Sequence, residues 1–192
     1  MVPVGLLRRF TTSRPNASSP VAMAARRRAQ AVQYDVFINH CGVDTRHTVA
    51  RLLHDRLRQL RVRSFLDSVS MRPGDRLVGC IDEGIRQCRV AVAIFSEHYV
   101  DSAFCLHELA SLVEARKLII PIFYGVKPSQ LVLPPAATAA RDVERFRAAL
   151  REAKYTVGLT YNPATGDLAE LVSAAANVVV RRIKEMESIG SP

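Results

Sequence analysis

Short apolar runs alternate along the chain with segments whose apolar residues recur every three or four positions. Runs of four to eight apolar residues are typical of buried strands, and the wider spacing is typical of helices that bury one face. Val90–Phe95 is apolar at every position, as expected for a central parallel strand that is covered on both sides. The predicted strands are 34–39, 62–66, 90–95, 118–124 and 155–161.

Helical spacing fills the segments between these strands. The predicted helices are 49–60, 77–85, 97–117 with an interruption near 100–104, 143–154 and 167–186. This alternation predicts an α/β fold with a doubly wound five-stranded parallel sheet. The strand order expected for it is the flavodoxin-like order 2-1-3-4-5, which is one of those that such a sheet can take. Ligands of such sheets bind at the carboxyl ends of strands one and three, where the winding reverses. The predicted loops at that edge are 40–45 and 96–104, and the loop from Asp67 to Asp75 lies beside them.

Glu108 is the candidate residue for chemistry. On a helical wheel Leu106, Leu109, Ala110 and Val113 share the apolar face, and Glu108 lies about half a turn away. The wheel alone therefore predicts that Glu108 does not face the sheet and is a solvated surface glutamate. Its position just after the third strand's loop places it near the expected ligand crevice, which favours a role in a pocket.

Charge is concentrated in the first part of the chain. The first 34 of 192 residues contain six arginines and no acidic residue, so the net charge of +9 falls to +3 from Tyr34 onward. We interpret residues 1–33 as a basic disordered arm or an organelle transit segment, and residues 34–189 as one domain. A charge of +3 without a basic stripe predicts no dedicated nucleic-acid site. No apolar run approaches the roughly 20 residues that span a bilayer, so no membrane partner is expected.

Cysteine spacing and missing motifs narrow the chemistry. The four cysteines form no CxxC pair, which predicts no metal site and favours reduced thiols in the cytoplasm, with organelle import through residues 1–33 as the alternative. Neither GxGxxG, GxxxxGK[ST] nor GxSxG occurs, and the third strand ends in Ser96 where a phosphoacceptor would need aspartate. A single carboxylate in a crevice remains, which suits an oxocarbenium-like transition state or a nucleophile.

Several ordered motifs resemble the plant-type Toll/interleukin-1 receptor (TIR) domain over about 34–189. They are YDVFIN at 34–39, Gly42, DTR at 44–46, RPGD at 72–75, AIFS at 93–96, Tyr99, CLHEL at 105–109 and IPIFY at 120–124. The resemblance implies a TIR fold and an NAD+ glycohydrolase that releases nicotinamide and ADP-ribose or cyclic ADP-ribose-type signals in plant immunity, with NAD+ as substrate and no cofactor. No nucleotide-binding or leucine-rich segment follows the motifs, so the chain resembles a TIR-only protein.

The resemblance also assigns site residues. Glu108 falls on the family's catalytic glutamate, and the expected substrate-binding residues are His40, Cys41, Gly42, Ser96, Phe104 and Cys105. Phe104 stands where the family usually has tryptophan, and Cys105 is expected to be a wall of the pocket rather than a nucleophile. His40 and Cys41 replace the usual Phe-Arg, which removes a fixed positive charge that could hold a pyrophosphate. His40 can supply that charge only when protonated, and a plain loop histidine is the alternative.

Partners follow from the same resemblance. Enzymatic TIR domains self-associate, with the loop from Asp67 to Asp75 of one protomer closing the site of the next and the helices at 49–60 and 168–186 forming a second interface. Core packing alone explains most apolar residues of those helices. Two other functions remain open: a non-catalytic adaptor that acts through TIR–TIR contact and does not need Glu108, and a nucleic-acid-processing assembly that depends on positive charge.

Overall fold

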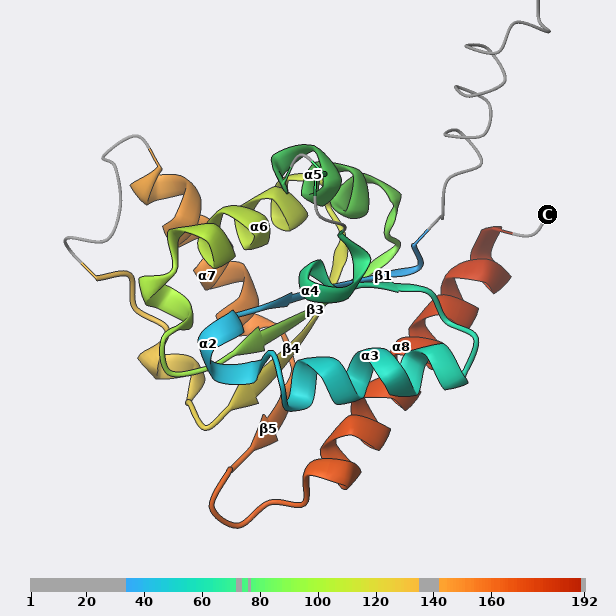
Figure 1. The fold of residues 1–192 in the computed structure, drawn as a ribbon. Helices are drawn as coiled ribbons and strands as arrows, with labels where there is room; N and C mark the ends of the chain where they lie inside the picture. The colour runs from blue at the N-terminus through green and yellow to red at the C-terminus, as the bar shows by residue number, and fades with distance from the viewer. Residues whose placement is uncertain (1–33, 72–73, 76, 135–141, 191–192) are drawn as a thin grey trace, which may run out of the picture. The chain divides into compact units, whose positions relative to one another are not determined.

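A computed structural model describes residues 34–71, 74–75, 77–134 and 142–190. The predicted arm at 1–33 lies outside the described residues, as do Arg72 and Pro73 of the predicted 67–75 loop. Figure 1 shows the strands and helices in order along the chain. They are β1 (Val36–His40), α2 (Gly42–Thr45), α3 (Val49–Gln59), β2 (Ser64–Phe65), α4 (Asp67–Ser70), α5 (Leu77–Gln87), β3 (Val90–Phe95), η1 (Tyr99–Asp101), α6 (Ala103–Glu114), β4 (Leu118–Tyr124), η2 (Pro128–Gln130), α7 (Val143–Tyr155), β5 (Leu159–Tyr161) and α8 (Leu168–Gly190).

The five strands form one parallel sheet in the order β2-β1-β3-β4-β5, which confirms the predicted fold class and strand order. β3 lies at its centre, where Val90 pairs with Val36 of β1 and with Leu118 of β4. All six residues of β3 are buried, as the unbroken apolar run predicts. The winding reverses between β1 and β3, so their carboxyl ends open a crevice.

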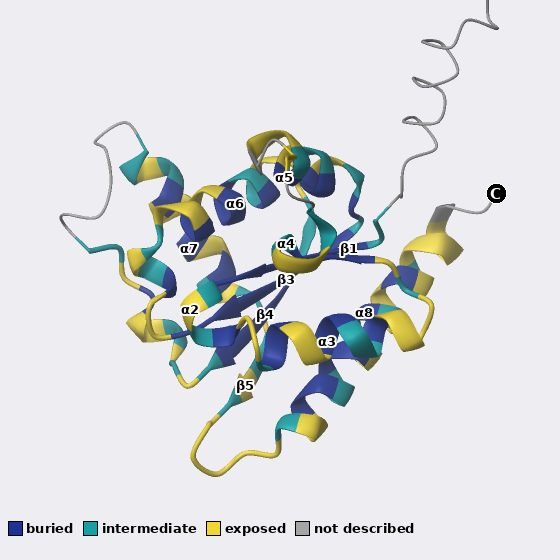
Figure 2. Cartoon of the chain, in the orientation of Figure 1, coloured by how far each residue is buried: buried dark blue, intermediate teal, exposed yellow. Residues whose placement is uncertain are grey.

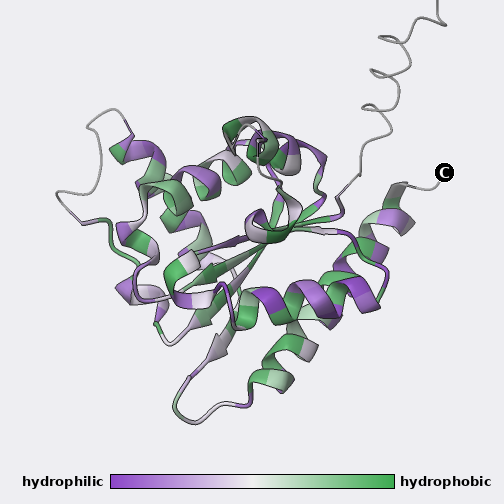
Figure 3. Ribbon diagram, in the orientation of Figure 1, coloured by the Kyte–Doolittle hydropathy of each residue, from purple (hydrophilic) through white to green (hydrophobic). Residues whose placement is uncertain are grey.

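Helices cover both faces of the sheet, with α3 and α8 on one side and α5, α6 and α7 on the other (Figure 1). Figure 2 shows their inner sides as dark blue, which marks buried residues. In Figure 3, α3 carries both green and purple along its length, as expected for a helix with one apolar and one polar face.

Side chains of β1 point alternately to the two faces of the sheet, so successive residues pack against different helices. Val36 and Ile38 belong to the core cluster that contains the α3 and α8 side chains. Phe37 belongs to the opposite cluster, with Ile81 and Ile85 of α5. Because successive side chains of a strand point to opposite faces, Asn39 lies on the side of Phe37, which is the side of α6.

Several predicted boundaries need correction. The segment predicted as a loop at 40–45 contains α2, and the loop from Asp67 to Asp75 begins with α4. Both helices have only four residues, too few for helical periodicity to be visible in the sequence. The edge strands β2 and β5 are shorter than predicted. The interruption predicted near 100–104 is real, because η1 ends at Asp101 and α6 starts at Ala103.

Candidate active site

A pocket of about 390 Å³ opens at the carboxyl end of β1, between α2, α4 and the start of α6. This is the sheet edge where the strand order predicts a ligand site. The pocket brings together five of the six predicted substrate-binding residues. They are His40, Cys41, Gly42, Phe104 and Cys105.

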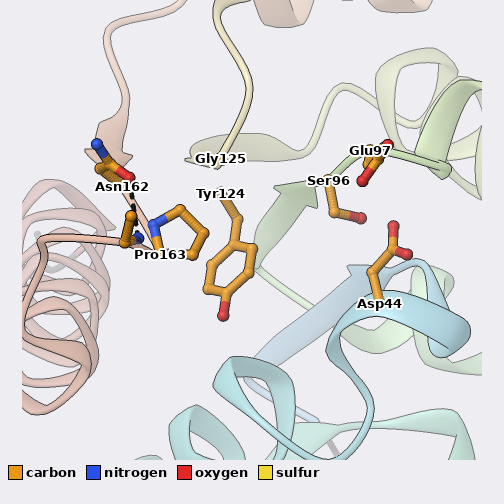
Figure 4. A pocket seen from close by; sticks show the side chains of 8 residues that line it. Asp44, Ser96, Glu97, Tyr124, Gly125, Asn162 and Pro163 are labelled. Carbon is orange, nitrogen blue, oxygen red and sulfur yellow. Dashed lines mark hydrogen bonds between the residues drawn. The ribbon is translucent and has the colours of Figure 1, made fainter.

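Ser96 lies in a different hollow, of about 380 Å³, which is shown in Figure 4. Its neighbours there include Asp44, Tyr124 and Asn162, from α2, β4 and the segment after β5. The Asp44 carboxylate accepts a hydrogen bond from the His98 backbone N–H at 2.9 Å and lies 2.7 Å from His98 Nδ1. This contact joins α2 to the segment after β3, and its two residues line different hollows: Asp44 lines that of Ser96, and His98 lines that of His40 and Cys41. The structure therefore separates Ser96 from the other predicted pocket residues.

Glu108 is buried, with 5% of its surface exposed, so the helical-wheel prediction of a solvated glutamate is wrong. The wheel fails because it considers only the apolar stripe of α6. In the structure α6 also packs against α5, α7, η1 and β1. Glu108 Oε2 accepts a hydrogen bond of 2.8 Å from Nδ2 of Asn39, at the end of β1. The carboxylate thus lies behind the pocket wall, one helical turn from Phe104 and Cys105.

Burial raises the pKa of Glu108 from 4.5 to about 8, because the ionised form loses its contact with water. The hydrogen bond from Asn39 lowers this pKa, and the negative charge of Asp67 raises it. A buried carboxylate with a raised pKa beside a pocket is a candidate for a catalytic residue.

The imidazole of His40 is held by the protein itself. Its Nδ1 lies 3.2 Å from Thr45 Oγ1, and its Nε2 lies 3.3 Å from Asp67 Oδ1. The hydrogen bond with His40 holds the pKa of Asp67 below its usual value. Both ring nitrogens are therefore engaged between β1, α2 and α4, and they are not free to bind a phosphate.

Arg46 is a pocket residue that the sequence-based reasoning missed. Its guanidinium packs on Gly42, where an added Cβ would lie 2.8 Å from Nη2. Arg46 is exposed, lines the same pocket and contributes positive charge near Asp67. Arg46 thus places a fixed positive charge in the pocket, where Cys41 stands in place of the arginine that the family usually has. The DTR motif held this residue, but the spacing alone did not show that its side chain returns over Gly42.

The two cysteines of the pocket are buried thiols. Burial raises the pKa of Cys41, and it raises the pKa of Cys105 to about 12. Cys105 Sγ lies 3.4 Å from the backbone oxygen of His40. Because the thiolate is the reactive form, these shifts favour a wall rather than a nucleophile. Phe104 is 41% exposed at the pocket mouth, where its ring can stack on a bound base.

Among residues 34–190 that the structure describes, no three His, Cys, Asp or Glu side chains form a group that could hold a metal ion. In the same residues no helix combines the length and apolar character that crossing a membrane requires.

Comparison with known proteins identifies a family and relatives that share this sequence. The model of the TIR domain family matches residues 33–158. The chain is 62% identical over 162 residues, 82% of its length, to "Probable 2' cyclic ADP-D-ribose synthase BdTIR" of Brachypodium distachyon and covers 72% of that protein. It is 29% identical over 84% of its length to "Disease resistance-like protein DSC1" of Arabidopsis thaliana, of which it covers only 14%.

Among solved structures, the fold is similar to the TIR domains of the activated Roq1 resistosome, with a TM-score of 0.68 and 26% sequence identity. That similarity covers 76% of this chain and 99% of the Roq1 chain. Fold, motifs and family match agree, and the chain belongs to the TIR domain family.

Proposed function

We propose that this protein is an NAD+ glycohydrolase that breaks the bond between nicotinamide and ribose and so makes a signal for plant immunity. The buried Glu108 carboxylate behind the pocket carries the proposal, because a purely adhesive domain has no use for an ionisable group that burial destabilises. The synthase named for the 62% identical relative supports the same chemistry.

Glu108 would act on the charge that develops during bond breaking. When nicotinamide leaves with the bonding electron pair, positive charge forms on the ribose ring, and a nearby carboxylate stabilises it. The cationic pyridinium of bound NAD+ lowers the pKa of Glu108, because an opposite charge favours the ionised form. Water, or a hydroxyl of the same substrate molecule, then bonds to the anomeric carbon and loses a proton. Attack by a 2′-hydroxyl would give a cyclic product of the kind named for the Brachypodium relative.

The remaining pocket residues would place the substrate. Arg46 is an exposed cation that lines the pocket, and it suits the diphosphate because its planar guanidinium binds phosphate oxygens in pairs. Phe104 suits an aromatic base at the mouth. Cys41, Gly42 and Cys105 would form the wall. No separate cofactor enters this scheme, because NAD+ itself is the substrate.

We also propose that the site is completed by self-association. Its volume of about 390 Å³ lies near the lower end of the roughly 300–1,000 Å³ typical of small-molecule pockets, although a dinucleotide is a large ligand. Asp67 of α4 lines the pocket, so α4 lies at the edge where a second chain would approach. The Roq1 TIR domains were solved within a resistosome. Helices α3 and α8 contact each other on the face of the sheet that α5, α6 and α7 do not cover. They offer the second surface for self-association.

The cytoplasm is the proposed location. All four cysteines are free thiols, as expected in a reducing compartment. The alternative of organelle import depends on residues 1–33. Imaging of a C-terminally tagged full chain beside a variant without residues 1–33 tests it, since an organelle signal that is lost on deletion would contradict a cytoplasmic location.

The test of the function compares the full-length wild type with Glu108→Gln. Both are incubated with NAD+ over a range of protein concentrations, and nicotinamide and the other product are measured by chromatography and mass spectrometry. We expect release by the wild type that rises more than linearly with protein concentration, and a loss of at least 100-fold in the variant. Equal release by both, or no release by either at any concentration, would contradict the enzyme and leave the adaptor.

A further inference from the structure

Glu108 belongs to a buried hydrogen-bonded chain that extends beyond Asn39. The Tyr99 hydroxyl, on η1, donates to Oδ1 of Asn39, whose Nδ2 donates to Glu108 Oε2 at 2.8 Å. Asn39 and Tyr99 are fully buried, at 0% exposure. These hydrogen bonds link β1 to η1 and α6, which lie about 60 residues later in the sequence.

The orientation of the Asn39 amide is fixed by a second contact. The backbone oxygen of Cys105 lies 3.3 Å from Asn39 Nδ2 and 3.4 Å from the Tyr99 hydroxyl. A carbonyl oxygen can only accept, so the amide nitrogen must face Cys105 and Glu108, and the amide oxygen must face Tyr99. A flipped amide would set its single oxygen against two acceptors, the Cys105 carbonyl oxygen and Glu108 Oε2.

Tyr99 remains the donor in its hydrogen bond with Asn39, so the direction of these hydrogen bonds does not change with pH. Burial raises its pKa well above the usual value, so the phenol stays protonated and remains a donor throughout the range in which Glu108 titrates. The other groups that face this cluster are Asp67, whose charge raises the pKa of Glu108, and the neutral thiols of Cys41 and Cys105. Asn39 is the only side chain among the described residues that is shown donating a hydrogen bond to the Glu108 carboxylate.

We propose that Asn39, held by Tyr99, is a positioning residue that fixes the orientation of the Glu108 carboxylate and keeps it available in its ionised form. A donated N–H favours a carboxylate over a carboxylic acid, and here it opposes the burial and the Asp67 charge that act the other way. The role in turnover rests on the proposed NAD+ chemistry. The effect on Glu108 does not, because it is a property of the free protein.

Direct titration of Glu108 tests the proposal apart from catalysis. Full-length protein labelled with ¹³C at the glutamate carboxyl carbon is titrated by NMR from pH 4 to 10, and Glu108→Gln identifies the signal. The midpoint for the wild type is expected near 8. Asn39→Leu, which has a similar size and no donor, is expected to raise it by about one pH unit, the worth of a charge-assisted hydrogen bond. Tyr99→Phe, which removes only the hydroxyl, is expected to raise it by a smaller amount.

Ser64→Ala provides the matched control. It removes an equally buried side-chain hydrogen bond, 2.8 Å between Ser64 Oγ and His54 Nδ1, that lies on β2 and α3 away from Glu108. Its Glu108 midpoint is expected to equal that of the wild type. If Asn39→Leu does not fold, Tyr99→Phe alone decides: a midpoint unchanged from the wild type overturns the proposal.

Turnover then provides the second measurement. With NAD+ as substrate, the acid limb of kcat/KM is expected to move to higher pH in both variants, with most activity regained above the new midpoint and KM changed little. A loss of kcat that is equal at every pH would show a merely structural role and would overturn the proposal. If the wild type releases no nicotinamide, the proposed function fails while the titration still decides the inference about Asn39.

Discussion

Replacement of Glu108 by glutamine should stabilise the fold while it abolishes turnover. Glutamine keeps an oxygen that accepts the hydrogen bond from Asn39, but it cannot ionise. In the wild type the folded protein holds the Glu108 proton more tightly than the unfolded chain does, since the pKa rises from 4.5 to about 8 on folding. The stability that this group contributes is therefore fully present below pH 4.5 and is lost as the pH rises through about 8.

The size of this change in the free energy of unfolding follows from the pKa shift, at about 1.4 kcal/mol for each pKa unit. Through Glu108 alone, the free energy of unfolding of the wild type should fall by about 3 kcal/mol between pH 4 and pH 7, and by about 5 kcal/mol by pH 9. Glu108→Gln removes this dependence. Relative to the wild type it should be unchanged at pH 4, about 3 kcal/mol more stable at pH 7 and about 5 kcal/mol more stable at pH 9.

Urea unfolding at pH 4, 7 and 9, followed by circular dichroism, measures these differences. Glu152→Gln, at an exposed position of α7, is the matched control and should shift stability by less than about 0.5 kcal/mol at each pH. A difference between Glu108→Gln and the wild type that stays constant from pH 4 to pH 9 would refute the reasoning, because it would mean that Glu108 titrates alike in the folded and unfolded chains.

Three further changes test the other pocket residues. Arg46→Gln should raise KM for NAD+ about tenfold with kcat unchanged, since it removes a charge that would hold the diphosphate in ground and transition states alike; an unchanged KM would contradict that role. Cys105→Ala should keep turnover within about threefold, because the raised pKa leaves Cys105 as a thiol; a loss above about 100-fold would point to a nucleophile. Asp67→Asn should cost about 1 kcal/mol at pH 7 by weakening the contact with His40. Because the pKa of Asp67 is lowered, this cost should shrink as the pH falls through that pKa, and a urea midpoint difference that grows in acid would contradict it.

The sequence predicted the architecture because the architecture depends on patterns that run along the chain. The apolar run of β3 and the helical stripe Leu106, Leu109 and Ala110 are local signals, and the buried positions of the structure confirm them. Right-handed crossovers narrow the possible strand orders, and the structure shows the flavodoxin-like order that was expected among them. The pocket was expected at the carboxyl end of β1, and it lies there.

The sequence did not predict the surroundings of Glu108, because they come from other elements. A helical wheel includes one helix only, whereas the hydrogen-bond partner of this carboxylate is Asn39 on β1 and the charge that acts on it is Asp67 on α4. Asn39 could have been found from the same alternation that places Phe37, had that strand been followed to the helix opposite its face. The placement of Ser96 in a second hollow, with Asp44, depends on two short segments that have no periodicity from which it could be predicted.

The two edges of the sheet have a consequence for assembly. β2 has two residues and β5 has three, so each exposes only a short row of unpaired backbone groups. Edges this short offer little template for another strand, which opposes the growth of a shared sheet from chain to chain. Under the self-association proposed above, chains can join through their helices and separate again without the irreversible cross-β aggregation that long open edges promote.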